Sequence, residues 1–154
     1  MLLFLDFDGV LHPEFVPGIS VGRYRTNTDY FSCLAAFEAV VRKHPSLQIV
    51  ISSTWRARRS LDELRAFFSH DIARRIIDVT PQLQGTKGNR QREIEAWMMQ
   101  HHWTGKWLAI DDRPLMFDED CSNVFFTETL IGLDADAAAA LDARLSGIER
   151  DETV

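Results

Sequence analysis

The sequence has little cysteine and no long apolar run, and both absences narrow the class of protein. Only Cys33 and Cys121 are present, far apart and without a CxxC spacing. This argues against a disulfide framework or a zinc knuckle and predicts a reduced, cytoplasmic setting. No run approaches the roughly 20 apolar residues of a membrane-spanning helix, so we expect no membrane association. The opening MLLFL is interrupted at Asp6 and Asp8, and we interpret it as a buried strand rather than a secretion signal.

Basic charge is also in short supply. The 17 Lys and Arg residues are outnumbered by 23 Asp and Glu residues, which gives a formal net charge of -6. This argues against a uniformly basic surface that coats nucleic acid, but it leaves a local basic groove open. With 154 residues, of which 45% are hydrophobic, we predict one globular domain over 1–148 and a fraying charged tail over 149–154.

Short apolar runs alternate with stretches of helical spacing along the chain. We predict strands at 2–7, 47–51, 76–79, 107–110 and 124–126. Helices are expected at 31–43, 60–68, 90–102 and 137–145, the second of them opened by a capping box of Ser60 and Glu63. This alternation predicts an α/β fold with a mainly parallel sheet of about five strands and helices on both faces.

The segment LFLDFDGVLH carries the most specific signal. An apolar strand delivers two carboxylates, Asp6 and Asp8, which are separated by one residue and followed by Gly9. Charges at the end of a buried strand need hydrogen bonds or a cation, and two neighbouring carboxylates repel each other. A divalent ion satisfies both requirements, whereas the alternative is that the pair only caps a turn before Gly9.

Two further strands end in polar residues. LAIDDRP finishes in Asp111 and Asp112, and QIVISSTW finishes in Ser52, Ser53 and Thr54. The carboxyl ends of parallel strands share one edge of the sheet, where ligands bind. We therefore expect these side chains to converge with Asp6 and to form an oxygen-rich site that suits Mg²⁺.

Basic residues surround the start of one predicted helix. TKGNRQREIEAW places Lys87, Arg90 and Arg92 where positive side chains and free backbone N–H groups can face an anion such as phosphate. Each of them taken alone is also compatible with an ordinary solvated helix face.

Together these segments resemble the haloacid dehalogenase-like (HAD) phosphatase superfamily, whose four motifs have the same order. DFDGVLH resembles the first motif, the serine after IVI the second, the basic residue before EIEAW the third, and IDD the fourth. DFDGVLHP and SSTWR are closest to the HAD domain of Swiss Army Knife RNA repair proteins. The finer resemblance also involves Trp55, Arg56, Arg90, Glu93, Ile94 and Trp97, and the FFT and GL pattern over 125–133.

The resemblance implies a three-layer, Rossmann-like phosphatase without a large cap domain. Asp6 would be the nucleophile that forms an aspartyl phosphate, and Asp8 the general acid and base. Mg²⁺ would be held by Asp6, by the backbone carbonyl of Asp8, and by Asp111 or Asp112. Phosphate would be bound by Ser52, with Ser53 as the second choice, and by Lys87 or Arg90.

The substrate stays open, whereas the sequence argues against one rival fold class. The gaps from Asp8 to Ser52 and from Thr54 to Lys87 leave no room for a cap, so the cleft is expected to be open. Such a cleft admits an RNA or DNA end, guided by Arg56, Arg58 and Arg59 together with Arg23 and Arg25. The alternatives are a small metabolite under a second subunit, or a catalytically silent binding module. A signalling receiver domain would need an acceptor aspartate where the chain reads ISSTW.

Overall fold

The computed structural model describes residues 1–14, 30–85 and 89–150 of the chain. Strands and helices alternate along most of this length, as the sequence predicts. The elements are, in chain order, β1 (Leu2–Leu5), α1 (Leu34–Lys43), β2 (Gln48–Ile51), the 3₁₀ helix η2 (Thr54–Ala57), α2 (Leu61–Arg65), α3 (His70–Ala73), β3 (Ile76–Val79), α4 (Asn89–Gln100), β4 (Trp107–Asp111), the 3₁₀ helix η3 (Pro114–Met116), β5 (Val124–Phe126) and α5 (Ala135–Arg150).

β1 lies at the centre of a five-stranded sheet with the order β3-β2-β1-β4-β5. Every pairing is parallel, and Leu5 of β1 lies opposite Ile51 of β2 on one side and Ile110 of β4 on the other. A parallel sheet needs cover on both faces, and all four residues of β1 are fully buried. The predicted mainly parallel sheet of about five strands is confirmed.

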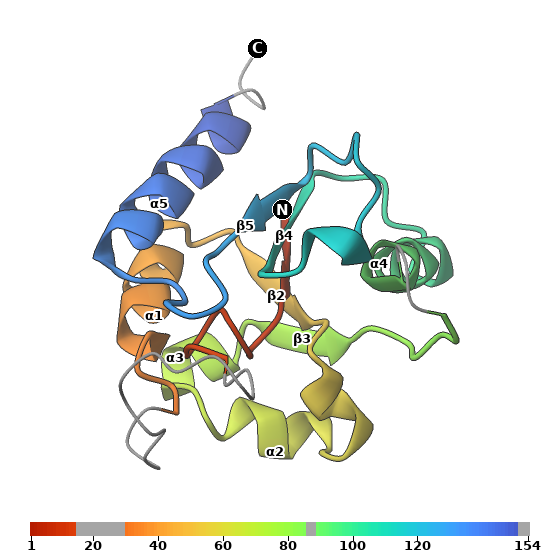
Figure 1. Cartoon of the computed structure of the whole chain (residues 1–154), viewed down its shortest axis with the longest axis horizontal. Coiled ribbons are helices and arrows are strands. Elements are labelled where there is room, and N and C mark those ends of the chain that lie inside the picture. Colours follow the sequence, from red (N-terminus) through yellow and green to blue (C-terminus); the bar gives the residue numbers. More distant parts are fainter. Residues whose placement is uncertain (15–29, 86–88, 151–154) are drawn as a thin grey trace.

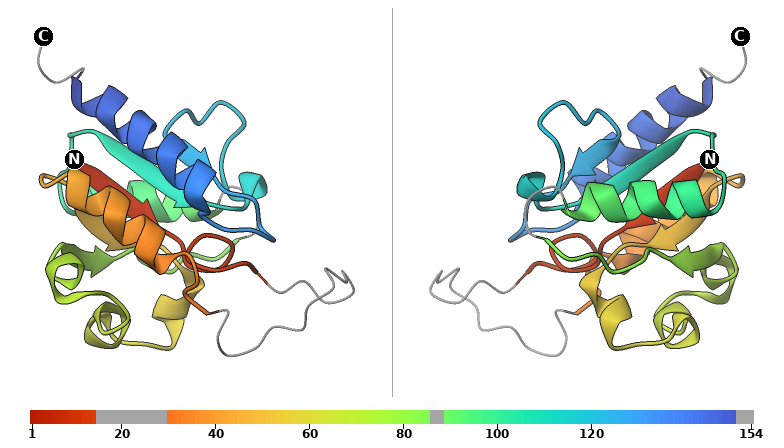
Figure 2. Two further views of the ribbon diagram at one scale, coloured as in Figure 1. Left: turned by 90° about the vertical axis from the view of Figure 1, so that its left-hand side faces the viewer. Right: turned by 90° about the vertical axis from the view of Figure 1, so that its right-hand side faces the viewer.

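Helices cover both faces of this sheet and produce three layers (Figures 1 and 2). α1 and α5 lie on one face, above a core cluster that contains Leu3 of β1. α4 lies on the other face, above a cluster that contains Phe4 of β1 and Trp97 of α4. Neighbouring residues of one strand thus enter opposite cores, and full burial of each such side chain contributes about 1.5–3 kcal/mol.

Local differences from the expected elements occur in two helical regions. The predicted capping box is present, because Ser60 Oγ accepts from the Glu63 N–H and the Glu63 carboxylate accepts from the Ser60 N–H. The helix ends at Arg65, however, before the predicted end at residue 68, and the short α3 that follows lies beyond any predicted helix. α5 continues through Arg150, past the predicted start of the tail, and residues 151–154 lie outside the described part of the chain.

The described connections are compact. Between Asp8 and Ser52 the structure shows only α1 and β2, and between Thr54 and Gly85 only η2, α2, α3 and β3, so the described residues contain no large cap domain. No helix in the three described ranges is both long enough and apolar enough to cross a bilayer. The edge of the sheet where β1, β2 and β4 end is therefore not covered by an inserted domain within these ranges.

Candidate active site

Three neighbouring strands end at one edge of the sheet and place polar side chains there. Asp6 follows β1, Ser52 follows β2, and Asp111 is the last residue of β4. Their backbones stay in register, since the Asp6 N–H donates to the Ile110 carbonyl (3.1 Å) and the Ser52 N–H donates to the Leu5 carbonyl (2.9 Å). The structure thus brings these residues together at the carboxyl edge, where open parallel sheets bind ligands.

Asp6, Asp111 and Asp112 form a compact cluster of buried carboxylates. One oxygen from each lies within 4.8 Å of the others. Within the described residues, Oδ2 of Asp111 and both carboxylate oxygens of Asp112 accept no hydrogen bond, although Nη1 of Arg90 lies 3.5 Å from Asp111 Oδ2 and Nε of Arg113 lies 3.9 Å from Asp112 Oδ1. Buried oxygens without partners are costly, so these atoms and the all-oxygen donor set fit a hard divalent cation such as Mg²⁺.

Burial raises the pKa of both carboxyls after β4. For Asp111, burial and then the negative charge of Asp6 raise the pKa to about 7, although Arg90 acts in the opposite direction. For Asp112, burial is again the largest cause and, with the charges of Asp6 and Glu14, raises the pKa to about 6. Burial and the repulsion between neighbouring carboxylates both favour the protonated forms, and a bound cation would favour the ionised forms.

Gly9 allows the loop after β1 to approach this cluster. Its φ is +72°, a left-handed conformation that side chains with a Cβ rarely adopt. A Cβ at this position would lie 2.3 Å from the Asp112 carboxylate. The glycine that follows Asp8 therefore provides the space in which the Asp112 carboxylate sits.

Arg90, in the first turn of α4, reaches the same cluster. Its Nη1 lies 3.4 Å from Asp6 Oδ1 and 3.5 Å from Asp111 Oδ2, and it also donates to the Ser52 carbonyl. Burial lowers the pKa of this guanidinium, but the charges of Asp6, Asp111 and Glu93 outweigh burial and raise the pKa above its ordinary value. A positive charge is therefore fixed between the two strand ends. Lys87, the other basic candidate, lies outside the described residues.

The two serines after β2 have different surroundings. The Ser52 hydroxyl is buried and lies 3.4 Å from Nη1 of Arg90, beside the carboxylate cluster. The Ser53 hydroxyl caps η2, where it accepts from the Trp55 N–H (3.4 Å). Of the two hydroxyls, that of Ser52 is thus the one in contact with the guanidinium of the site.

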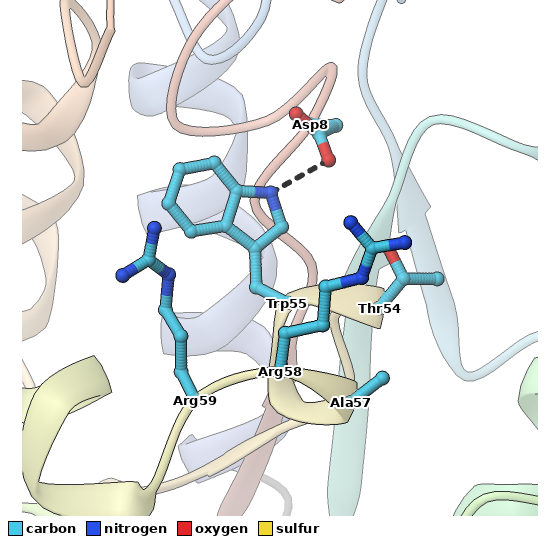
Figure 3. Close-up of a pocket in the computed structure, with 6 residues that line it drawn as sticks. All are labelled: Asp8, Thr54, Trp55, Ala57, Arg58 and Arg59. Carbon is cyan, nitrogen blue, oxygen red and sulfur yellow. Dashed lines mark hydrogen bonds between the residues drawn. The ribbon is translucent and has the colours of Figure 1, made fainter.

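Two ring nitrogens hold the carboxylate of Asp8, which does not belong to the side-chain cluster. Trp55 Nε1 donates to Oδ2 (2.9 Å; Figure 3), and Nε2 of the fully buried His12 lies 2.9 Å from Oδ1. The Phe31 N–H donates to Nδ1 of His12 (3.4 Å), which favours the tautomer whose proton is on Nε2. In this tautomer, Nε2 of His12 and Nε1 of Trp55 both donate to the Asp8 carboxylate. The indole contact could not be predicted, although Trp55 directly follows the second motif.

The arginines after β2 divide into one structural residue and two residues at a cavity. Arg56 is buried and donates to the carbonyls of Ser52, Ser53, Thr80 and Pro81 and to Glu93 (2.6 Å). The expectation that it guides a nucleic-acid backbone is therefore wrong, because its donors are already used inside the protein. Arg58 and Arg59 instead line a cavity of about 570 Å³ beside Asp8 (Figure 3). Arg23 and Arg25 lie outside the described residues.

Comparison with known families identifies this arrangement. Residues 2–138 match the family described as the HAD domain in Swiss Army Knife RNA repair proteins. The chain belongs to this family. A search of curated proteins and a search of solved structures each gave no match. HAD membership confirms the predicted superfamily and fold, and it supports a hydrolase of the phosphatase type.

Several residues that carry the resemblance have structural roles in this HAD domain. The Arg56–Glu93 pair joins the segment after β2 to α4, and Glu93 also accepts from the Leu83 N–H (3.0 Å). Trp97 packs against Phe4 and donates to Asp78 (2.7 Å). Arg56, Glu93 and Trp97 therefore position the strand ends and α4 around the carboxylates.

Proposed function

We propose that the chain is a magnesium-dependent phosphomonoester hydrolase that forms an aspartyl phosphate on Asp6. The observation that carries this proposal is the cluster of Asp6, Asp111 and Asp112 at one edge of the sheet, with Arg90 between the first two. Family membership supports the reaction class. Carboxylates for a cation and a fixed guanidinium are the groups that position a transferring phosphoryl group.

The first step transfers the phosphoryl group to the protein. A carboxylate oxygen of Asp6 attacks phosphorus, the bond from phosphorus to the leaving oxygen breaks, and Asp8 gives that oxygen a proton. Arg90 and the Ser52 hydroxyl neutralise and orient the phosphoryl oxygens. The Trp55 and His12 nitrogens hold the Asp8 carboxyl in place during this transfer. Two displacements of this kind have lower barriers than a single attack by water.

The second step restores the protein. Asp8, now ionised, takes a proton from water, the water oxygen attacks phosphorus, and inorganic phosphate leaves Asp6. Mg²⁺ would be held by Asp6, Asp111 and Asp112 and by the backbone carbonyl of Asp8, and it would offset the repulsion between carboxylates and phosphate. The buried oxygens of Asp111 and Asp112 that accept no hydrogen bond support the assignment of the cation to this cluster.

RNA or DNA ends are the proposed substrates, because the matched family is described from RNA repair proteins. The two unpaired thiols are compatible with a reducing, cytoplasmic location. One alternative is a phosphatase for small metabolites whose open cleft is covered by a second subunit. The other is a binding module that has the same fold but no catalytic activity. A screen of phosphorylated metabolites against oligonucleotides with terminal phosphates separates the two enzymes.

Hydrolysis of an aryl phosphate tests the reaction itself. We expect turnover that requires Mg²⁺ and is lost on addition of EDTA, and we expect Asp6→Asn to reduce it to background. Asp62→Asn is the matched control, because the Asp62 side chain is exposed on α2 and pairs there with Arg65. Acid quenching during turnover should trap phosphate on the protein. Full activity of Asp6→Asn would refute the mechanism.

A further inference from the structure

The cavity beside Asp8 has a defined place relative to the proposed reaction. It is lined by Asp8, Thr54, Trp55, Ala57, Arg58 and Arg59, and not by Asp6 or Asp111. Asp8 gives its proton to the leaving oxygen, so the group bonded to that oxygen lies next to Asp8. The occupant of the cavity is therefore the leaving group rather than the transferring phosphoryl group. This step rests on the proposed function.

Two arginines give this cavity positive charge that no described carboxylate neutralises in an ion pair. Arg56 and Arg90 nearby form ion pairs with buried carboxylates, whereas Arg58 and Arg59 form no ion pair with any described residue. Both are exposed at the cavity (Figure 3). On a chain with a net charge of -6, two such guanidinium groups beside the acid residue favour an anionic ligand at this point.

Arg59 is also oriented in advance. Its guanidinium carbon lies 5.2 Å from the centre of the Trp55 ring and 5.5 Å from that of Phe67. Contact with two aromatic rings restricts the positions that this guanidinium can take, and a guanidinium held in this way can still donate to a phosphate. Little rotamer entropy is then lost when an anion binds.

The cavity is large enough to hold a small organic anion such as a nucleotide. A volume of about 570 Å³ lies within the range of roughly 300–1,000 Å³ that is usual for small-ligand sites. We infer that this cavity is a leaving-group subsite for a nucleotide that carries a phosphate of its own, held by Arg58 and Arg59. The preferred substrate then has a second phosphate one nucleoside away from the phosphate that is removed.

Matched substrates test this subsite. Uridine 3′-monophosphate and uridine 5′-monophosphate leave an uncharged nucleoside, whereas uridine 3′,5′-bisphosphate and a 5′-phosphorylated oligouridylate leave an anion. We expect kcat/KM to be higher for the anionic leaving groups by roughly tenfold or more, the effect of one charged hydrogen bond. A higher rate with the oligonucleotide than with the bisphosphate would show that the second phosphate belongs to a nucleic-acid strand. A higher rate with the bisphosphate would show that it belongs to a free nucleotide.

Removal of the two charges gives the second half of the test. In Arg58→Gln/Arg59→Gln the preference over the monophosphates should disappear, and the slope of log kcat/KM against log salt for the oligonucleotide should fall by about 0.7 for each phosphate that is no longer neutralised. Arg74→Gln/Arg144→Gln removes the same charge at exposed positions away from the cavity and should keep the preference. Wild-type protein without a preference, or a preference that survives in the cavity variant, would overturn the inference.

Failure of the proposed function can be distinguished experimentally from failure of the subsite inference. If neither the aryl phosphate nor any nucleotide is hydrolysed, the reaction assignment fails, and calorimetric binding of uridine 3′,5′-bisphosphate then decides the subsite. Binding that weakens in the cavity variant but not in the charge-matched control supports it. Equal binding by both variants overturns it.

Discussion

The carboxylate of Asp8 is held by two donors from different parts of the chain. The Trp55 indole comes from η2 and the His12 imidazole from the loop after β1. A carboxyl group that must deliver a proton to one atom depends on such orientation, because small misplacements reduce the rate strongly. The proton transfer that we propose for Asp8 thus depends on the positions of Trp55 and His12 as well.

Trp55→Phe separates the hydrogen bond from the packing. The phenyl ring retains part of the contact with Phe7, Phe31 and Phe67, but the N–H is lost. We expect kcat for an aryl phosphate to fall about tenfold or more, the usual effect of losing one bond to a charged group. Trp103→Phe is the control, because Trp103 Nε1 has no hydrogen-bond partner in the described part of the chain. An equal fall in both variants would contradict the role of Trp55.

Gly9→Ala tests the close approach of the loop to Asp112. The left-handed backbone costs roughly 1–2 kcal/mol with a Cβ, and the new methyl group would displace the carboxylate 2.3 Å away. We expect weaker Mg²⁺ activation, measured as a higher Mg²⁺ concentration at half-maximal rate. Gly147→Ala in α5 meets no atom within 4 Å and should raise stability by up to about 1 kcal/mol without changing activation. Unchanged activation in Gly9→Ala would show that Asp112 does not bind the cation.

Sequence reasoning finds the carboxylates of the site but not the residues that hold them. Asp6, Asp111 and Ser52 are predictable because each follows an apolar run, and parallel strands end at one edge. The buried role of Arg56 is not predictable, because an arginine in the series Arg56, Arg58 and Arg59 has no local feature that marks it as internal. Its partner Glu93 lies on a different helix, and only the folded chain brings the two together.

At the scale of elements, Arg56 joins the ends of β2 and β3 to α4. Its five hydrogen bonds reach four carbonyls and the nearly buried Glu93. The segment after β2 carries Ser52, and α4 carries Arg90, so this one side chain fixes the distance between two groups of the site. Displacement of Arg56 would therefore affect the site as well as the fold.

Arg56→Met should lower the free energy of unfolding by about 3–5 kcal/mol, because Glu93 would remain buried without its partner. Urea denaturation measures this loss. The double variant Arg56→Met/Glu93→Met should recover part of it, since both charges are then removed together. Lys43→Met, which breaks an exposed pair with Asp142, should hardly shift the midpoint. A loss as small as that of Lys43→Met would contradict a structural role for Arg56.

The elements themselves follow from the sequence to a large extent. The strands from Ile76 and from Val124 have the predicted bounds, and the Ser60 capping box starts α2 as predicted. α3 is missed because four residues give no helical periodicity. α5 extends into the first two residues of the predicted tail because Glu149 lies 2.8 Å from Nδ1 of the buried His44, a contact that no local pattern indicates.

At the scale of the whole molecule, the carboxylate cluster couples stability to pH, and the proposed function predicts a coupling to Mg²⁺ as well. The pKa of Asp111 is raised from 3.8 to about 7, and that of Asp112 to about 6. Both groups bind a proton more tightly in the folded chain than in the unfolded one. The stability of the metal-free protein therefore falls as pH rises from about 4 through about 7.

Thermal melts with EDTA and with Mg²⁺ test this coupling. We expect the gain in Tm from Mg²⁺ to be larger at about pH 8, where the carboxylates are ionised, than at about pH 5, where protons compete with the cation. Asp111→Asn should flatten the pH dependence in EDTA, because one of the two groups no longer titrates. A gain from Mg²⁺ that is equal at both pH values would exclude a metal site at these carboxylates.

The central position of β1 in the sheet has a consequence for folding during synthesis. Leu2 pairs with Gln48 on one side and with Trp107 on the other, so the central strand is made before its two neighbours and gains the second of them only after β4 emerges from the ribosome. Until then one edge of a wholly apolar strand stays open to wrong partners. Newly made chains should thus depend on chaperones most strongly in the interval between synthesis of β2 and synthesis of β4.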